Sequence, residues 1–289
     1  MKMSRFVVAV CASVVLAGAL AMSGKAGSGA AGVAPPADSA ASWRTDPVWH
    51  DGLVEKATYA ASKVIYGQPR SYTAIVFTNK EQHDTKTWTK ATGSKSTVEV
   101  FKHNQIEAVP TPNYAYHFVT TSHLSVEGML LTRYDQSSQE FCGTSFRSLL
   151  PTSEKAGREY SLETFSYMPE AGRVSAQLKS AGRPMVPEDA LPLYLRDFAF
   201  NAEASQAIDL LPTQKSNRAA AIATVAAKVR YAGMDGGDHK VELLVGDQLR
   251  GTYFFAADRQ HVMTRYRSAD GSQTYDLQTH ERTDYWTIR

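Results

Sequence analysis

Cysteine is scarce in this chain. Two cysteines occur in 289 residues, and only Cys142 lies outside the apolar N-terminal run. Once that run is removed no intramolecular disulfide can form, so a buried core has to hold the fold, which a chain of this length can supply. The histidines form no His-x-His or His-Glu-x-x-His pattern and no Cys/His pair at zinc spacing. The sequence therefore predicts no metal site and no cofactor.

An excess of charge of one sign is also missing. The chain carries 31 Lys and Arg against 29 Asp and Glu, and removal of Lys2 and Arg5 with the N-terminal run makes the two numbers equal. Without a basic block, the sequence predicts no binding of nucleic acid. Gly-rich phosphate loops and a Gly-x-Ser-x-Gly elbow between strand and helix are absent too, so nothing supports a nucleotide-binding protein or a serine hydrolase.

The N-terminus has the features of an export signal. Basic residues precede an uncharged apolar run at residues 6–20, and Ala19-Leu20-Ala21 forms a small-x-small cleavage site. The run is shorter than the roughly 20 residues that a transmembrane helix needs. We expect residues 1–21 to be a signal peptide, the protein to be periplasmic or secreted, and no transmembrane anchor to be present. Residues 22–42 are nearly all Gly, Ala, Ser, Pro and Val, which predicts a disordered tether.

Beyond residue 42, short segments rich in Val, Ile, Thr, Tyr and Phe alternate with turn residues, which is typical of strands. We expect twelve strands, at residues 55–65, 71–78, 97–103, 114–121, 128–134, 140–147, 159–167, 223–231, 240–245, 252–256, 262–267 and 274–278. Short connections favour antiparallel pairing, and so many strands favour curvature. Helical spacing occurs at residues 187–198. Residues 43–289 are thus expected to form a single mainly β domain, a curved antiparallel sheet or partial β-barrel with one short helical stretch.

One segment resembles a known family. Ser137-Ser138-Gln139-Glu140-Phe141-Cys142-Gly143 is similar to a Ser-x-Gln-Glu-Trp-Cys-Gly strand in a poorly characterised bacterial envelope family, often labelled septum formation inhibitor Maf; Phe141 replaces the Trp. The resemblance extends to Asp51-Gly52-x-x-Glu55 with Tyr59, to Tyr66-Gly67-x-x-Arg70 with residues 73–78, and to Glu188-Asp189 with Leu191. True Maf nucleotide pyrophosphatases have a Ser-x-Ser-x-x-Arg start and an α/β fold, which this sequence lacks. The resemblance therefore implies kinship and no reaction. The last third of the chain resembles envelope domains of unknown function thought to share curved sheets with periplasmic lipoprotein carriers.

The candidate ligand-binding residues surround that motif. If the motif is a strand, Glu140 and Cys142 share one face. A carboxylate facing a cavity would need a cationic partner, and Arg70, Arg133 and Arg147 are the natural ones.

Aromatic residues are spread over nearly every expected strand. In Tyr114-x-Tyr116-x-Phe118 the three rings share one face. Such rings either fill a core or line an apolar cavity, and we place Tyr116 in the candidate ligand site. We expect Cys142 to be a buried, inert thiol. A reactive thiol would instead need a histidine base, for which the sequence offers His117 and His123.

Three functions stay open on these grounds. The first is a non-enzymatic envelope domain that binds an apolar or amphipathic ligand, such as a lipid, in its concavity. Its ligand-binding residues would be Arg70, Tyr116, Arg133, Glu140 and Cys142, with no catalytic residue. The second is an envelope hydrolase that uses Glu140 with a His or Arg partner. The third is a protein-interaction or assembly module with an exposed sheet edge.

Overall fold

A computed structural model describes residues 43–93, 95–168, 172–216, 222–284 and 286. The expected signal peptide at residues 1–21 and the expected tether at residues 22–42 lie outside the described residues.

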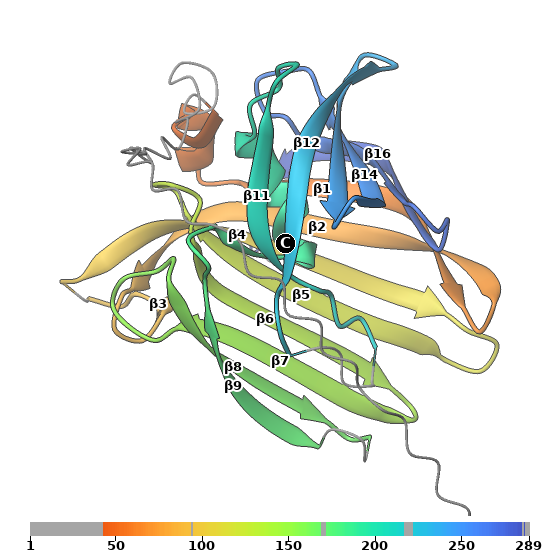
Figure 1. Cartoon of the computed structure of the whole chain (residues 1–289), viewed down its shortest axis with the longest axis horizontal. Helices are drawn as coiled ribbons and strands as arrows, with labels where there is room; N and C mark the ends of the chain where they lie inside the picture. The colour runs from red at the N-terminus through yellow and green to blue at the C-terminus, as the bar shows by residue number, and fades with distance from the viewer. Residues whose placement is uncertain (1–42, 94, 169–171, 217–221, 285, 287–289) are drawn as a thin grey trace, which may run out of the picture. The chain divides into compact units, whose positions relative to one another are not determined.

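The described strands form one sixteen-stranded sheet (Figure 1). In sheet order they are β10 (Met185–Pro187), β11 (Ser205–Leu211), β12 (Val225–Asp235), β13 (Asp238–Val245), β14 (Gln248–Ala256), β15 (Met263–Ser268), β16 (Gln273–Thr283), β1 (Val54–Ile65), β2 (Gln68–Asp84), β4 (Thr97–Pro110), β5 (Ala115–Ser125), β6 (Leu131–Glu140), β7 (Gly143–Pro151), β8 (Glu159–Ser166) and β9 (Arg173–Lys179). The short β3 (Thr89–Lys90) pairs with β2 outside this order. Neighbours pair antiparallel except β10 and β11, which are parallel.

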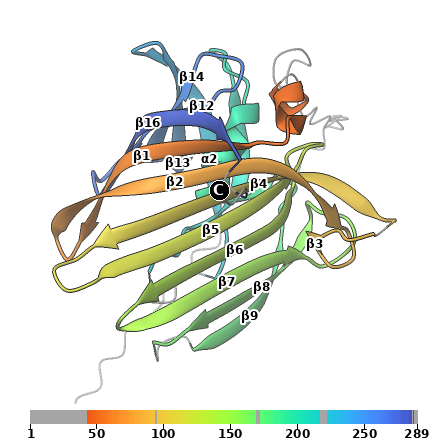
Figure 2. The same ribbon diagram turned by 180° about the vertical axis from the view of Figure 1, so that it is seen from behind.

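The sheet is open, because β9 and β10 end the order without pairing to each other. It is nevertheless strongly curved: β4 to β7 run side by side as long strands, whereas β11, β12 and β14 run steeply across them (Figures 1 and 2). The expected class, a curved antiparallel sheet or partial barrel of mainly β structure, is confirmed. The pairing of β16 with β1 joins the last described strand to the first and makes the sheet continuous.

Alternation along the central strands defines an inner and an outer face. On β1, Ala57, Tyr59 and Ala61 are buried, while the side chains between them are more exposed. Residues directly opposite in an antiparallel pair point to the same face. The pairing of Lys63 with Arg70 therefore places both on the inner face with the buried residues of β1.

The expected helical stretch is confirmed and is buried. It consists of η2 (Glu188–Ala190), α2 (Leu191–Tyr194) and η3 (Leu195–Asp197), preceded in the chain by a separate 3-10 turn, η1 (Pro47–His50). Pro192 lies in the first turn of α2, where its missing N–H leaves no helical hydrogen bond unmade. No helix in the described part of the chain is long and apolar enough to cross a membrane.

Two expectations about strands were wrong. The sequence missed β3, β9, β10 and β11. It also predicted one strand through residues 140–147, whereas a two-residue turn, Phe141-Cys142, separates β6 from β7 there. Gly143 explains the turn: its φ of 144° is readily open only to glycine, and a Cβ there would lie 2.7 Å from the Tyr167 ring.

Candidate functional site

A pocket of about 580 Å³ opens where the β1–β2 turn, the start of β5 and the β6–β7 turn meet the segment at residues 212–216. Its apolar lining consists of Val64, Ile65, Phe118 and Met168. Its polar lining consists of Lys63, Tyr66, Tyr116, Glu140, Cys142, Lys215 and Ser216. The pocket thus combines a hydrophobic wall with ammonium, carboxyl and phenol groups, which suits an amphipathic molecule better than a purely apolar one.

The pocket rim carries a tyrosine in a rare backbone conformation. Tyr66 and Gly67 form the two-residue β1–β2 turn, with φ values of 52° and 72°. Such turns require positive φ at both positions, which glycine accepts and a bulky side chain resists. Tyr66 is 80% exposed, and its hydroxyl lies 2.6 Å from the hydroxyl of Tyr116. This contact holds the exposed ring at the pocket mouth.

Cys142 is exposed, so the expectation of a buried thiol was wrong. The reason is its place in the β6–β7 turn, where Phe141 is 88% exposed as well. The sulfur lies 3.2 Å from the hydroxyl of Tyr114. His117 and His123 alternate with the inward-facing residues of β5 and therefore lie on the outer face. Neither can act as a base for the Cys142 thiol.

Lys63 is the cation at the inner end of the pocket. Its ammonium donates to the backbone carbonyl of Lys215 at 3.1 Å and lies 4.5 Å from the centre of the Phe118 ring. Burial, together with the nearby charge of Lys215, lowers the pKa of Lys63 to about 8. At neutral pH the ammonium is therefore charged but poorly compensated.

Lys215, in contrast, is fully compensated. Its ammonium lies 2.6 Å from Glu107 and 3.4 Å from Asp189. Burial alone would lower the pKa of Lys215, but the two carboxylates raise it above its usual value. The carboxylate of Glu107 also accepts hydrogen bonds from Tyr72 and Tyr275. This network joins β4, the helical stretch and the interior segment into a fixed wall of the pocket.

The segment at residues 212–216 is held by the inner face of the sheet. Arg147 donates to the carbonyl of Pro212 at 2.8 Å, and the hydroxyl of Ser145 donates to the carbonyl of Ser216 at 2.7 Å. Both donors come from β7, so this strand anchors the segment at its two ends.

Three of the five residues expected to bind ligand line this pocket, namely Tyr116, Glu140 and Cys142. Arg70 lies on the inner face opposite Lys63 but does not line the pocket. Arg133 pairs with His123 across the β5–β6 ladder and therefore lies on the outer face, where its guanidinium binds Asp135. The suggestion of Arg133 as a partner for Glu140 was wrong, because a carboxylate on its own strand, two residues away, takes the guanidinium.

No family model matches the chain, and neither does any curated protein. Among solved structures it is similar to the crystal structure of a beta-barrel-like protein of domain of unknown function DUF1849 from Brucella abortus. The two share 11% sequence identity over 80% of this chain and 98% of that chain, with a TM-score of 0.44. A likeness at this level assigns neither family nor function.

Sequence reasoning missed the two lysines of the pocket. Lys63 had a detectable signal, since it occupies a position that alternation along β1 assigns to the buried face. Lys215 had none, because it lies in an irregular segment between strands.

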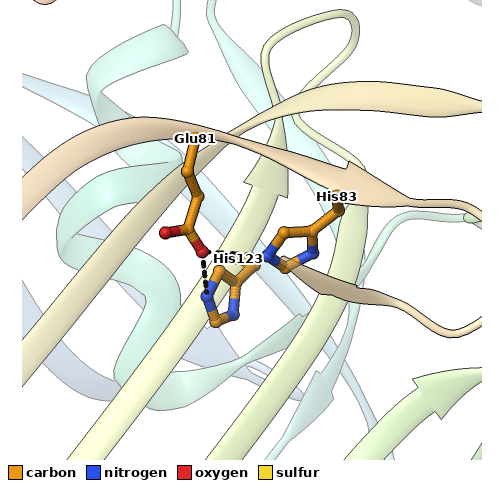
Figure 3. Close-up of side chains that lie close together, drawn as sticks. All are labelled: Glu81, His83 and His123. Atoms are coloured by element: carbon orange, nitrogen blue, oxygen red, sulfur yellow. Dashed lines mark hydrogen bonds and ion pairs between the residues drawn. The ribbon is translucent and has the colours of Figure 1, made fainter. Parts of the chain in front are cut away.

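The spacing of the histidines in the sequence did not indicate a cluster of possible metal ligands, but the structure contains one. Glu81, His83 and His123 converge on the outer face, away from the pocket (Figure 3). A Glu-x-His pair on one strand was the only trace of this cluster in the sequence, since the second histidine comes from a strand that is distant in the chain.

Proposed function

We propose that this protein is an exported, non-enzymatic binding domain for an amphipathic ligand with an acidic head group. The observation that carries the proposal is the pocket of about 580 Å³ in which Lys63 lies beside an apolar wall. The N-terminal residues expected to be a signal peptide support export.

The charge balance around Lys63 favours an anionic head group. Glu107 and Asp189 are both engaged by Lys215. Of the three carboxylates that raise the pKa of Lys63, Glu140 has the weakest effect. A bound anion would give the buried ammonium a dedicated partner and strengthen a charge-assisted hydrogen bond. The hydrocarbon part of the ligand would pack against Ile65 and Phe118.

The other two functions have less support. A hydrolase using Glu140 would need a histidine or arginine facing the same ligand, and neither type is among the described residues that line the pocket. An assembly module would need an edge strand open to pairing. The edge strand β9 begins at Arg173 and ends at Lys179, and charged side chains on an edge oppose such pairing.

The first experiment is native mass spectrometry. The full chain is expressed with its own N-terminus, recovered from the envelope fraction, and weighed before and after mild organic extraction. A bound mass that extraction removes supports the proposal and identifies the ligand class, whereas a bare chain from a fraction rich in lipids speaks against it.

The second experiment uses a defined probe. Dodecanoate and its uncharged counterpart dodecanol are titrated into the extracted protein. We expect Lys63→Met to weaken dodecanoate binding about tenfold or more, as loss of a charge-assisted hydrogen bond would, and to leave dodecanol binding nearly unchanged. Lys56→Met is the matched control, because Lys56 lies on the other face of β1 and pairs with Glu281. Equal losses in both variants would contradict the proposal.

A further inference from the structure

The outer face of the sheet brings together three side chains whose chemistry suits a divalent transition metal. Glu81 and His83 come from β2 and His123 from β5, with β4 between these strands (Figure 3). One ligand atom from each residue lies within 4.8 Å of the other two. We propose that Glu81, His83 and His123 form a zinc-binding site.

The distances fit tetrahedral coordination. Zinc binds imidazole nitrogen and carboxylate oxygen at about 2.0–2.2 Å, so two ligands on one tetrahedral ion lie about 3.3 Å apart. The Nε2 atom of His83 lies 3.0 Å from Oε1 of Glu81, and Nε2 of His123 lies 3.4 Å from the same oxygen. Both rings therefore turn the same nitrogen toward one oxygen of Glu81, at separations close to those between two ligands of a tetrahedral zinc ion.

Both rings can present a lone pair there. In the metal-free protein Nε2 of each ring donates to Oε1 of Glu81 and therefore carries the proton. Neither Nδ1 atom, of His83 or of His123, has a hydrogen-bond partner among the described residues, so the proton is free to move to Nδ1 when Nε2 binds a metal. Burial alone would raise the pKa of Glu81, but hydrogen bonds from the two histidines keep it below its usual range.

The surroundings explain why these groups gain from a shared cation. The side chains of His83 and His123 are 1% and 6% exposed, and that of Glu81 is 10% exposed. These two buried imidazoles share a single carboxylate oxygen as their hydrogen-bond partner. An ion with ligands from β2 and β5 would satisfy all three residues at once and would tie the ends of these strands together.

Nearby cations set the character of the remaining coordination position. Lys102 on β4 lies 3.9 Å from the second oxygen of Glu81, and Lys90 on β3 lies opposite His83 in the β2–β3 pair. Arg133 on β6 lies opposite His123 but is neutralised by Asp135. Three protein ligands leave a fourth position open. The positive side chains around it favour hydroxide or another small anion there over a neutral ligand.

The site is also reachable. Glu81 lines a surface pocket of about 470 Å³ together with Asn79, Lys80, Gln82 and Lys90. Glu81 thus connects the proposed site to this surface pocket, and none of the three proposed zinc ligands lines the pocket of about 580 Å³.

Equilibrium dialysis of the full chain against zinc, with metal counted by atomic emission, tests the proposal. We expect one zinc per chain, bound at least about tenfold more weakly by Glu81→Gln, His83→Gln and His123→Gln, since even an outer-shell loss has that effect. His117→Gln is the matched control, because His117 is an exposed histidine on the same face of β5 as His123. His239→Gln removes one member of the pair formed by His239 and His261, and should also leave zinc binding unchanged.

A spectroscopic readout keeps the test decisive if a variant does not fold. Cobalt added to the wild-type chain should give the intense visible absorption of a four-coordinate ion, and zinc should remove it. Absence of that absorption, a wild type that binds no zinc, or loss of binding in His117→Gln or His239→Gln instead would overturn the proposal.

Discussion

At the scale of the residue, the most informative group is Lys63. Its pKa of about 8 means that the ammonium loses its charge within the pH range in which the folded protein can be studied. An anionic probe should therefore bind well below pH 8 and progressively more weakly above it, by up to about tenfold for each pH unit. Titration of dodecanoate between pH 7 and 10, followed by calorimetry, measures this. The affinity for dodecanol should not depend on pH. A dodecanoate affinity that does not change with pH would show that Lys63 does not contribute to dodecanoate binding.

Cys142 gives a second test at this scale. Because the thiol is exposed in the β6–β7 turn and lines the pocket, iodoacetamide should alkylate it in the folded protein about as fast as in urea. Saturating dodecanoate should slow the reaction severalfold. Peptide mass mapping locates the label, and Cys142→Ser removes it. Protection of the thiol without any ligand would mean that this turn is covered in solution.

At the scale of the element, a buried ion pair fastens the helical stretch to the sheet. Arg196 in η3 donates to both oxygens of Glu55 on β1, at 2.7 and 3.0 Å, and its guanidinium lies 4.7 Å from the centre of the Trp43 ring. Removing one partner of such a pair leaves a buried charge uncompensated. We expect Glu55→Gln to lower the free energy of unfolding by about 3 kcal/mol.

Urea denaturation followed by tryptophan fluorescence measures that loss. Lys56→Gln is the control, because the Lys56–Glu281 pair is more exposed and should contribute less than about 1 kcal/mol. Similar losses in the two variants would show that the Glu55–Arg196 pair has no special role in docking the helical stretch.

Elements with a strong local pattern were predictable, and those defined by distant contacts were not. β1 and β2 alternate buried and exposed residues in the sequence itself; β1 has nearly its expected bounds, and β2 contains the expected strand and extends beyond it at both ends. β10 has three residues and exists through parallel pairing with β11, so no local pattern marks it. β9 is mostly exposed and polar. The same holds for the pocket. Its residues in the β6–β7 region were predicted from a local motif, whereas Lys215 reaches the pocket only through contacts between distant parts of the chain.

At the scale of the whole molecule, buried titratable groups predict loss of stability in acid. Burial lowers the pKa of His103 to about 4, from 6.5. The pKa of Glu55 and that of Glu107 lie below the usual 4.5: burial opposes this, but Arg196 and Lys215 outweigh it. In all three cases the unfolded chain binds more protons than the folded one as pH falls, so stability present at neutral pH is lost. Asp197 has the opposite sign, because burial raises its pKa to about 6.

The urea midpoint should therefore fall from pH 6.5 downward, first through His103 and then, below about pH 4.5, through the carboxylates. His103 alone should contribute on the order of 3 kcal/mol across its shift. His103→Gln should make the profile less steep between pH 6.5 and 4 without abolishing its slope, because burial also lowers the pKa values of His123, His239 and His261. It should leave the steeper loss below pH 4.5, to which Glu55 and Glu107 contribute. Equal midpoints at pH 7 and 4.5 in the wild type would mean that His103 is hydrated in solution and that the inner face of the sheet admits water as far as β4.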